Sequence, residues 1–371
     1  MNTLAASPSR FRRLLRGLFR LAAWGGAIVA LGMGALALMP FVASDFWFAD
    51  NMSFFLPQLI GCGGLALLGA ALCRVLAGRR LRRTVFAGVA AVALAALAGS
   101  TVLTALRTAS VLAIGRAGES DLARQPDGQP FRVVSINLEM RYLGDAEFMA
   151  YLESLNADVL VFQETNWRQQ LRYREKVRKE TGPLVGLGPY FSTHVIGTLG
   201  SITFFSRYPI LSSESIPVGD VCGAGRWGER EILRITLDVK GKPVTFVALH
   251  PESPRSPCRF EARQNYYATL GLTLAALRRE GQGPVLLAGD WNMSPWSAHF
   301  SQLLEAGGLK TRFPTFMPVI TRFFFDYRLS WFLGSAVDHI AVSPDVEIRS
   351  VTLGPDVGSD HVPLIADLQL P

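Results

Sequence analysis

The sequence predicts an α/β sandwich preceded by three membrane-spanning helices. Two observations lead to this fold class. Three stretches in the N-terminal part are apolar and contain no Lys, Arg, Asp or Glu, and each has about the 20 residues that a helix needs to cross a bilayer. After them, β-branched and aromatic runs alternate with helical patterns up to the C-terminus.

The apolar stretches run from Leu21 to Ala43, from Phe54 to Leu72 and from Val85 to Leu106, and the second helix is expected to reach residue 76. A single such stretch could belong to a cleaved signal peptide, but three in succession do not. The alternative of buried core helices in a soluble domain fits their length poorly. We therefore expect residues 1–107 to form a membrane anchor.

Basic residues orient these helices. Two groups of five Arg flank them, one before the first helix and one between the second and the third: Arg10, Arg12, Arg13, Arg16 and Arg20, then Arg74, Arg79, Arg80, Arg82 and Arg83. Positively charged loops stay in the cytoplasm. The loop between the first two helices has Asp45 and Asp50, no basic residue, and three aromatic residues typical of a membrane interface. The sequence thus predicts a multi-pass inner-membrane protein with a cytoplasmic N-terminus and, after three crossings, a periplasmic or extracellular C-terminal domain.

Charge is distributed unevenly along the chain. Residues 1–128 contain thirteen Arg and five acidic residues, whereas residues 129–371 contain 24 basic and 25 acidic residues. The formal net charge of +7 therefore belongs to the anchor. Nucleic acid stays an alternative partner, but the outer domain lacks the overall positive charge that would favour it.

Residues 108–130 are expected to be a linker, because they contain several Gly and Pro and no sustained periodicity. A domain over residues 131–371 follows. Its strand patterns are separated in places by helical patterns, as at 146–155 and 258–280, which predicts sheets packed between helical layers. The expected strands are "RVVSINL", "ADVLVFQE", "GSITFFS", "EILRITLDV", "VTFVALH", "PVLLAGDWN", "VDHIAV" and "PLIADLQL".

Polar residues stand at the ends of these strands. Taken singly, each is more typical of a turn or a strand-end cap. Together they indicate a site, since active sites of layered sheets commonly collect on one rim. The residues are Asn137, Gln163, Glu164, His250, Asp290, Asn292, Asp338, His339, Asp360 and His361.

The residue types point to a metal-assisted reaction. Oxygen ligands from Glu164, Asn137 and Asp360 suit a hard cation, Mg²⁺ or alternatively Mn²⁺, and no Cys and His cluster at zinc spacing competes. Asp290 and Asn292 alternate on one face of a strand, so a proton acceptor lies beside an amide.

His361 and Asp338 form the second pair. A carboxylate that orients an imidazole stabilises charge or moves a proton. Combined with a metal and a carboxylate base, these groups describe the hydrolysis of a phosphate ester.

Residues 131–370 resemble the endonuclease/exonuclease/phosphatase superfamily, which includes DNase I-like nucleases, sphingomyelinases and inositol polyphosphate 5-phosphatases. The matching motifs are "SINLEM", "VFQET", "VALHPESP", "LAGDWNMSP", "VDHIAV" and "GSDHVPL". The resemblance implies a four-layer α/β sandwich of the DNase I type. It implies that Asn137 and Glu164 hold the metal, with Asp360 nearby.

The same resemblance assigns the remaining roles. His250 would contact the scissile phosphate or act as an acid, and Asp290 would activate water. Asn292 would bind phosphate, while Asp338 and His361 would form the pair described above.

Some residues depart from the family pattern or stay outside it. Trp291 replaces a common Phe, and its side chain is expected to point into a core. Pro251 directly follows His250, which leaves substrate contacts there open. His339 is expected to be structural, and His194 and His299 receive no role.

Two segments bear on the substrate. The stretch at 168–180 has six basic residues and could attract a phosphate headgroup or simply be a solvated face. The stretch from Phe313 to Phe332 has eight aromatic residues and is either core or an apolar wall that favours a lipid-linked substrate. A periplasmic nuclease and a non-catalytic binding module are the alternative functions.

The outer domain has two cysteines, Cys222 and Cys258. One precedes an expected strand, and the other follows the next strand. Two consecutive antiparallel strands bring these ends to the same edge of a sheet, so we predict a disulfide, which an oxidising compartment would preserve.

Overall fold

The computed structural model describes residues 8–77, 83–114, 128–139, 141, 143, 145–165, 193–197, 199, 201–219, 222–223, 230–281 and 283–371. The chain divides into two compact units, Met1–Arg107 and Thr108–Pro371.

The first unit is helical. Its elements are α1 (Pro8–Val42), α2 (Trp47–Asn51), the short 3₁₀ helix η1 (Met52–Phe55), α3 (Leu56–Leu76) and α4 (Arg83–Ala113). Three helical stretches, Phe11–Val42, Trp47–Leu76 and Thr84–Ala113, are long and apolar enough to cross a membrane, as the sequence predicted. Helix α4 continues past residue 106, so the first part of the expected linker is helical.

Small residues allow these helices to pack closely. A side chain at Gly26 of α1 would collide with the Ala66 carbonyl oxygen of α3, and one at Gly34 would collide with Ala96 of α4. Trp24 packs edge to face on Phe86, with ring centroids 5.5 Å apart. Small residues at such crossings are typical of helices that associate in lipid, because close backbone approach improves van der Waals packing.

The second unit contains two six-stranded sheets and a small two-stranded one. The order of the first sheet is β13 (Glu347–Leu353), β14 (Leu364–Leu370), β1 (Gln129–Asn137), β2 (Val159–Gln163), β4 (Ile202–Ser206) and β3 (Thr193–Ile196). The order of the second is β5 (Ile210–Val218), β6 (Arg230–Val239), β7 (Lys242–Leu249), β8 (Val285–Asp290), β12 (Asp338–Val342) and β9 (Lys310–Thr311). The small sheet pairs β10 (Arg322–Phe323) with β11 (Gly334–Ser335).

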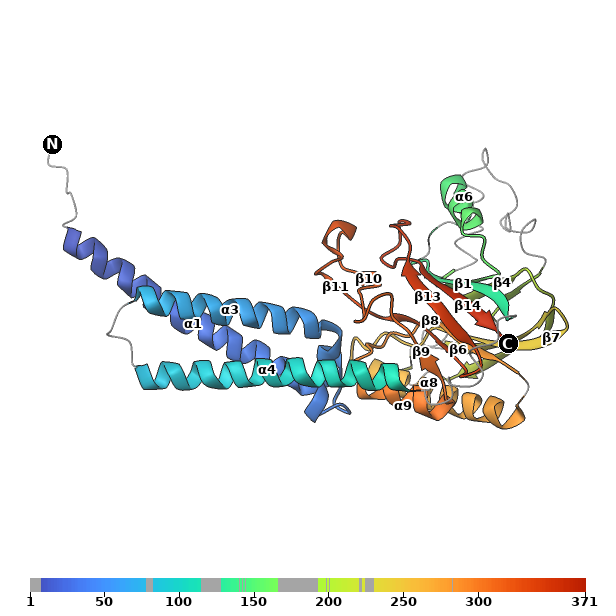
Figure 1. The fold of residues 1–371 in the computed structure, drawn as a ribbon, viewed down its shortest axis with the longest axis horizontal. Helices are drawn as coiled ribbons and strands as arrows, with labels where there is room; N and C mark the ends of the chain where they lie inside the picture. The colour runs from blue at the N-terminus through green and yellow to red at the C-terminus, as the bar shows by residue number, and fades with distance from the viewer. Residues whose placement is uncertain are drawn as a thin grey trace. The chain divides into compact units, whose positions relative to one another are not determined.

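The two large sheets face each other inside helical layers. Alternate residues of each strand point to opposite faces of a sheet. Val133 of β1 therefore joins the core between the sheets, while its neighbour Val134 packs toward α6 (Ala146–Ser154). On the far side, α8 (Pro257–Glu280) and α9 (Ala298–Gly307) cover the second sheet. Figure 1 shows α6 on one side of the sheets and α8 with α9 on the other. This is the predicted four-layer α/β sandwich.

The strand register brings the polar strand ends together. In the first sheet β1 runs parallel to β2 and antiparallel to β14, so the end of β1 lies beside the end of β2 and the start of β14. In the second sheet Asp338, the first residue of β12, pairs with Asp290, the last residue of β8. A hydrogen bond of 3.1 Å from Asn137 Nδ2 to Asp290 Oδ2 joins the two sheets at this rim.

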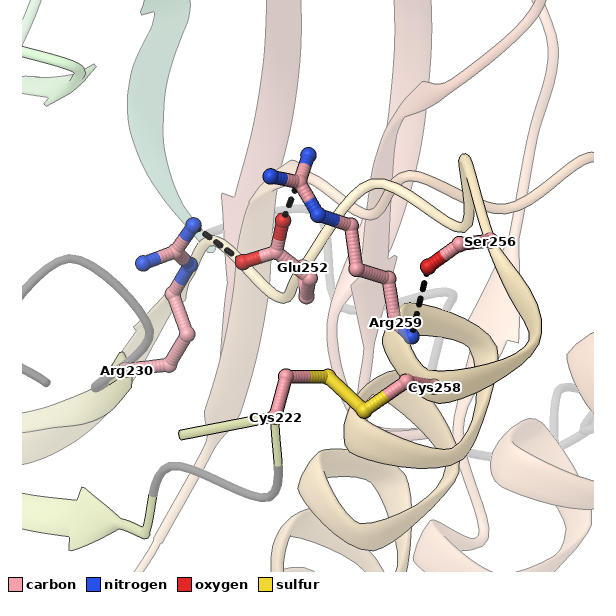
Figure 2. Close-up of a disulfide and its surroundings, with 6 residues drawn as sticks. All are labelled: Cys222, Arg230, Glu252, Ser256, Cys258 and Arg259. Carbon is pink, nitrogen blue, oxygen red and sulfur yellow. Dashed lines mark hydrogen bonds and ion pairs between the residues drawn. A yellow bond between two sulfur atoms is a disulfide. The ribbon is translucent and has the colours of Figure 1, made fainter. Parts of the chain in front are cut away.

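The predicted disulfide between Cys222 and Cys258 is present, with the two Cα atoms 5.8 Å apart. Strands β6 and β7 pair antiparallel, which explains why a cysteine before β6 meets one at the start of α8. Figure 2 shows the bond beside Glu252, which pairs with Arg230 and, at 3.5 Å, with Arg259. The disulfide and these ion pairs hold the segment that leaves His250.

Candidate active site

Asp290 lies at the centre of the candidate site. It ends β8 and is almost fully buried. The residue before it, Gly289, has a φ of +154°, and a side chain there would collide with the carbonyl of Leu249. The residue two positions later, Asn292, has a φ of 45°, and its N–H donates to Asp290 Oδ1 at 2.8 Å. The "GDWN" sequence therefore makes a tight turn that aims the Asp290 carboxylate at the rim.

Glu164 and His250 lie on one side of Asp290. Asn137 donates from Nδ2 to Glu164 Oε1 at 3.2 Å as well as to Asp290. His250 Nε2 is 3.5 Å from Glu164 Oε1 and 3.8 Å from Asp290 Oδ2. Asn137 thus bridges two carboxylates that would otherwise repel each other, while its Oδ1 accepts from the N–H of Glu139 at 3.0 Å.

The charge state of Glu164 follows from these contacts. Burial opposes ionisation, but hydrogen bonds and charge interactions with His250 and Asn137 outweigh burial and lower the pKa of Glu164 to about 2. Its side chain is still 38% exposed. Glu164 is therefore an ionised carboxylate that a ligand can reach.

His361 and Asp338 lie on the other side of Asp290. His361 Nδ1 is 2.8 Å from Asp338 Oδ2, and its Nε2 is 3.8 Å from Asp290 Oδ2. Burial alone would lower the pKa of His361, but the charges of Asp338 and Asp290 raise it to about 9. The imidazole is therefore a buried cation between two carboxylates.

The pKa of Asp290 is raised above its usual value. Burial raises its pKa, and so does the neighbouring charge of Asp338, whereas the cationic His361 opposes this rise. A carboxylate whose pKa is raised is a better proton acceptor than an exposed one.

Asp360 is held at the edge of the site. Its Oδ1 is 3.6 Å from His361 Nε2, and its Oδ2 accepts from Arg322 Nε at 2.9 Å. Its N–H donates to Glu139 Oε2 at 3.0 Å. The structure thus brings together the eight residues to which the sequence assigned a catalytic or metal-binding role. Each contacts at least one other member of the set: Asn137, Glu164, His250, Asp290, Asn292, Asp338, Asp360 and His361.

Residues 134–361 match the model of the endonuclease/exonuclease/phosphatase family. The chain belongs to this family. Among curated proteins, the comparison found no match.

Several solved structures are similar to this chain. An endonuclease/exonuclease/phosphatase family protein from Bacteroides thetaiotaomicron is 18% identical, covers 66% of this chain and 99% of its own, and has a TM-score of 0.48. Sphingomyelinase C from Streptomyces griseocarneus is 18% identical, with coverages of 64% and 99% and a TM-score of 0.44. Humanized TDP2 from D. rerio is 18% identical, with coverages of 64% and 98% and a TM-score of 0.45.

Several residues of this family member stay outside the chemistry. The Trp291 ring is buried in the core beside Phe300, as predicted, with ring centroids 5.0 Å apart. His339 is buried on the same side, where its Nε2 is 2.9 Å from the Met293 carbonyl oxygen and burial lowers its pKa to about 4. His194 stacks on Phe205, and His299 contacts Gln264. The basic stretch at 168–180 lies outside the described residues.

Sequence reasoning missed the residues that hold the site from behind. Arg263 of α8 is fully buried and donates to the Asn292 carbonyl oxygen at 2.8 Å. Tyr266 accepts from the N–H of His250 at 3.2 Å, and Tyr267 donates to the Trp291 carbonyl oxygen. An Arg on the apolar face of a predicted helix was the available signal, because a buried guanidinium needs acceptors.

Arg322 and Glu139 were also missed. Both contact Asp360. Glu139 directly follows the predicted strand "RVVSINL", so its place at a strand end was the available signal. Arg322 belongs to the aromatic stretch, so its pattern pointed to packing rather than to the site.

Asn292 Nδ2 donates to the Pro251 carbonyl oxygen at 3.0 Å and so ties the "GDWN" turn to the segment after His250. Its predicted contact with phosphate stays a prediction.

Proposed function

We propose that this protein is a membrane-anchored phosphoesterase that uses a divalent metal and faces the outside of the cytoplasm. The observation that supports this most is the meeting of three groups at Asp290 Oδ2: the amide of Asn137 and the imidazoles of His250 and His361. A buried carboxylate flanked by two imidazoles can accept a proton from water while positive charge stabilises a phosphoryl group.

The residues fit a hard cation, for which we propose Mg²⁺ with Mn²⁺ as the alternative. Glu164 supplies an ionised, accessible carboxylate. Asn137, whose amide contacts Glu164, and Asp360, which contacts His361, would supply further oxygen atoms. Such a cation would neutralise charge on the phosphoryl oxygens. Asp290, Asp338 and His361 also lie within 4.8 Å of one another, close enough to hold an ion. We favour Glu164 because its carboxylate is accessible, whereas His361 Nδ1 and Asp338 Oδ2 are buried and already paired at 2.8 Å.

Hydrolysis needs a proton to leave water and another to reach the departing alcohol. Asp290 takes the first proton as the water oxygen bonds to phosphorus. The bond from phosphorus to the alcohol oxygen then breaks, and His250 gives that oxygen a proton. His361, charged through Asp338, stabilises the negative charge that develops on the phosphoryl oxygens. Asn292 is proposed to donate to one of those oxygens.

The membrane side of the proposal has two supports. The three apolar helices are long enough to cross a bilayer, and the two Arg clusters flanking them favour a cytoplasmic N-terminus. Independently, the Cys222 to Cys258 disulfide suits an oxidising compartment. Both support the proposal that the catalytic unit lies in the periplasm of a bacterium with two membranes, or outside a cell with one.

The test compares Asp290→Asn with wild-type full-length protein in detergent. Bis-p-nitrophenyl phosphate and p-nitrophenyl phosphate serve as diester and monoester probes, each with Mg²⁺, with Mn²⁺ and with EDTA. We expect EDTA to abolish hydrolysis and Asp290→Asn to lower kcat by about 10²-fold or more, since a general base is lost.

Asp367→Asn is the matched control, because Asp367 pairs with Arg132 on the first sheet and has no contact with the site. Activity that survives in Asp290→Asn, or in EDTA, contradicts the assignment. Absence of activity in the wild type on both probes, and on phospholipids, nucleotides, DNA and RNA, favours a binding module.

A further inference from the structure

The aromatic stretch has both buried and exposed side chains. Phe313 and Phe323 are buried, as expected for a core segment. Residues 322–335, here called the aromatic hairpin, consist of β10, the 3₁₀ helix η4 (Tyr327–Leu329) and β11. Within it Phe325 is 97% exposed, Trp331 78% and Leu329 42%.

The exposed side chains sit on an ordered backbone. The N–H of Phe324 donates to Leu333 O at 2.8 Å, and the N–H of Leu333 donates to Leu329 O at 2.7 Å. Asp326 caps η4 by accepting from the N–H of Arg328. Phe325 has a φ of 68°, a conformation that a bulky residue rarely adopts. The hairpin therefore holds the Phe325 side chain in solvent, in an unfavourable backbone conformation, instead of packing it into the core.

The hairpin is joined directly to the candidate site. Arg322, its first residue, forms a β-bridge with His361 and an ion pair of 2.9 Å with Asp360. An open groove of about 790 Å³ runs beside this junction. Phe324 and Tyr327 line it on the hairpin side, and Glu139 and Asp360 line it on the site side. A substrate bound at the site therefore has an aromatic wall next to it.

A lipid surface fits this hairpin better than a soluble partner does. Aromatic residues next to a charged one are typical of the membrane interface, where the rings enter the acyl boundary and the charge stays with the headgroups. Arg328, whose exposed side chain forms an ion pair of 2.6 Å with Asp326, supplies such a charged group. The catalytic unit begins at Thr108, within the helical stretch Thr84–Ala113 that is apolar enough to cross a membrane, so this unit is tethered to a bilayer by its own chain.

We propose that the aromatic hairpin inserts Phe325 and Trp331 into the bilayer interface, and that the substrate is a lipid carrying a phosphate ester in its headgroup. The second part rests on the phosphoesterase function proposed above. Insertion would bring the groove and Asp360 to the depth of the headgroups, where such an ester lies.

The first experiment measures insertion and does not depend on activity. The full chain, with Cys62→Ser and Cys73→Ser, receives a single labelling site by Phe325→Cys and is placed in liposomes of phosphatidylcholine and phosphatidylglycerol. An environment-sensitive dye at this site should be quenched by brominated lipids at least about twofold more than a dye at the control Ser213→Cys, on an exposed part of β5. Equal quenching at the two sites overturns the insertion.

The second experiment measures substrate use in the same liposomes. Trp331→Ser combined with Leu329→Ser should lower phospholipid hydrolysis about tenfold, because each apolar side chain removed weakens interfacial binding. Hydrolysis of soluble bis-p-nitrophenyl phosphate should not change. The control, Leu272→Ser with Leu211→Ser, removes exposed leucines elsewhere on the unit and should leave both rates unchanged.

The outcomes separate the two proposals. A wild type that cleaves the soluble diester but neither lipid overturns the lipid substrate and leaves the phosphoesterase intact. A wild type that cleaves neither the soluble diester nor the phospholipids contradicts the proposed phosphoesterase function. The quenching experiment then still shows whether the hairpin inserts. Equal losses on soluble and lipid substrates in the hairpin variant contradict a role at the interface.

Discussion

The pair formed by His361 and Asp338 gives the sharpest test of the site. Asp338→Asn keeps the size of the side chain and removes its charge. Both residues are about 2% exposed, and they are 2.8 Å apart. Because Asp338 is the largest cause that raises the pKa of His361, the variant should lose most of that rise.

The magnitude follows from the pKa. A rise from 6.5 to about 9 corresponds to about 3 kcal/mol, at about 1.4 kcal/mol per pKa unit. At pH 7.5 the wild-type imidazole is therefore almost fully charged, and the Asp338→Asn imidazole mostly neutral. We expect kcat at this pH to fall by about 10²-fold or more, since a preorganised charge is lost from the transition state.

The assay is the pH dependence of kcat on bis-p-nitrophenyl phosphate, with Asp367→Asn as the control. Wild type and control should lose activity as pH rises through about 9, because His361 then loses its proton. The alkaline limb of Asp338→Asn should move to lower pH. A variant with the wild-type alkaline limb and an undiminished kcat would refute the role of the pair.

Stability should follow the same titration. Since the folded state raises the pKa of His361, its contribution is fully present below pH 6.5 and is lost as pH rises through about 9. The difference in Tm between wild type and Asp338→Asn should therefore be largest at low pH and shrink above pH 9.

Two further predictions concern the disulfide and the topology. The double variant Cys222→Ser, Cys258→Ser should lower the free energy of unfolding of the catalytic unit by about 4 kcal/mol, because the disulfide closes a loop across a sequence separation of 36 residues. A wild-type Tm that is the same with and without reductant would contradict this. Alkaline phosphatase fused after Gly118 should be active, since that reporter matures only outside the cytoplasm, and an inactive fusion would reverse the proposed orientation.

The sequence was sufficient for the parts of the fold that depend on local pattern. Three uncharged apolar stretches predicted the three helices, and alternating strands predicted the sandwich. The end of α4 was placed too early, because residues 107–114 contain no Gly or Pro to stop a helix, and the first glycine of the expected linker is Gly115. Val111 is buried in the core of the catalytic unit, a packing contact that no local pattern announces.

The site could be predicted where residues stand at strand ends, and it could not where contacts come from loops. His361 and Asp338 each adjoin an apolar strand, one in each sheet, so the expectation of a shared rim predicted their meeting. Arg322 reaches Asp360 only because β10 pairs with β11 and bridges to His361, a register that the sequence does not encode locally. Which atoms of the Asn137 amide face the carboxylates likewise depends on neighbours from both sheets.

The backbone at the site is stabilised by the same side chains that are proposed to do the chemistry. Glu139, Glu164 and Asn292 all have positive φ, which costs about 1 to 3 kcal/mol per residue unless surrounding contacts compensate. The N–H of Asn292 bonds to Asp290 Oδ1, and the N–H of Glu139 bonds to Asn137 Oδ1. Removing Asp290 as Ala would therefore also release the turn that positions Asn292 and, through it, the Pro251 carbonyl. Asp290→Asn retains an oxygen acceptor for that N–H, so a loss of activity in this variant reports on the proton acceptor and not on a collapsed turn.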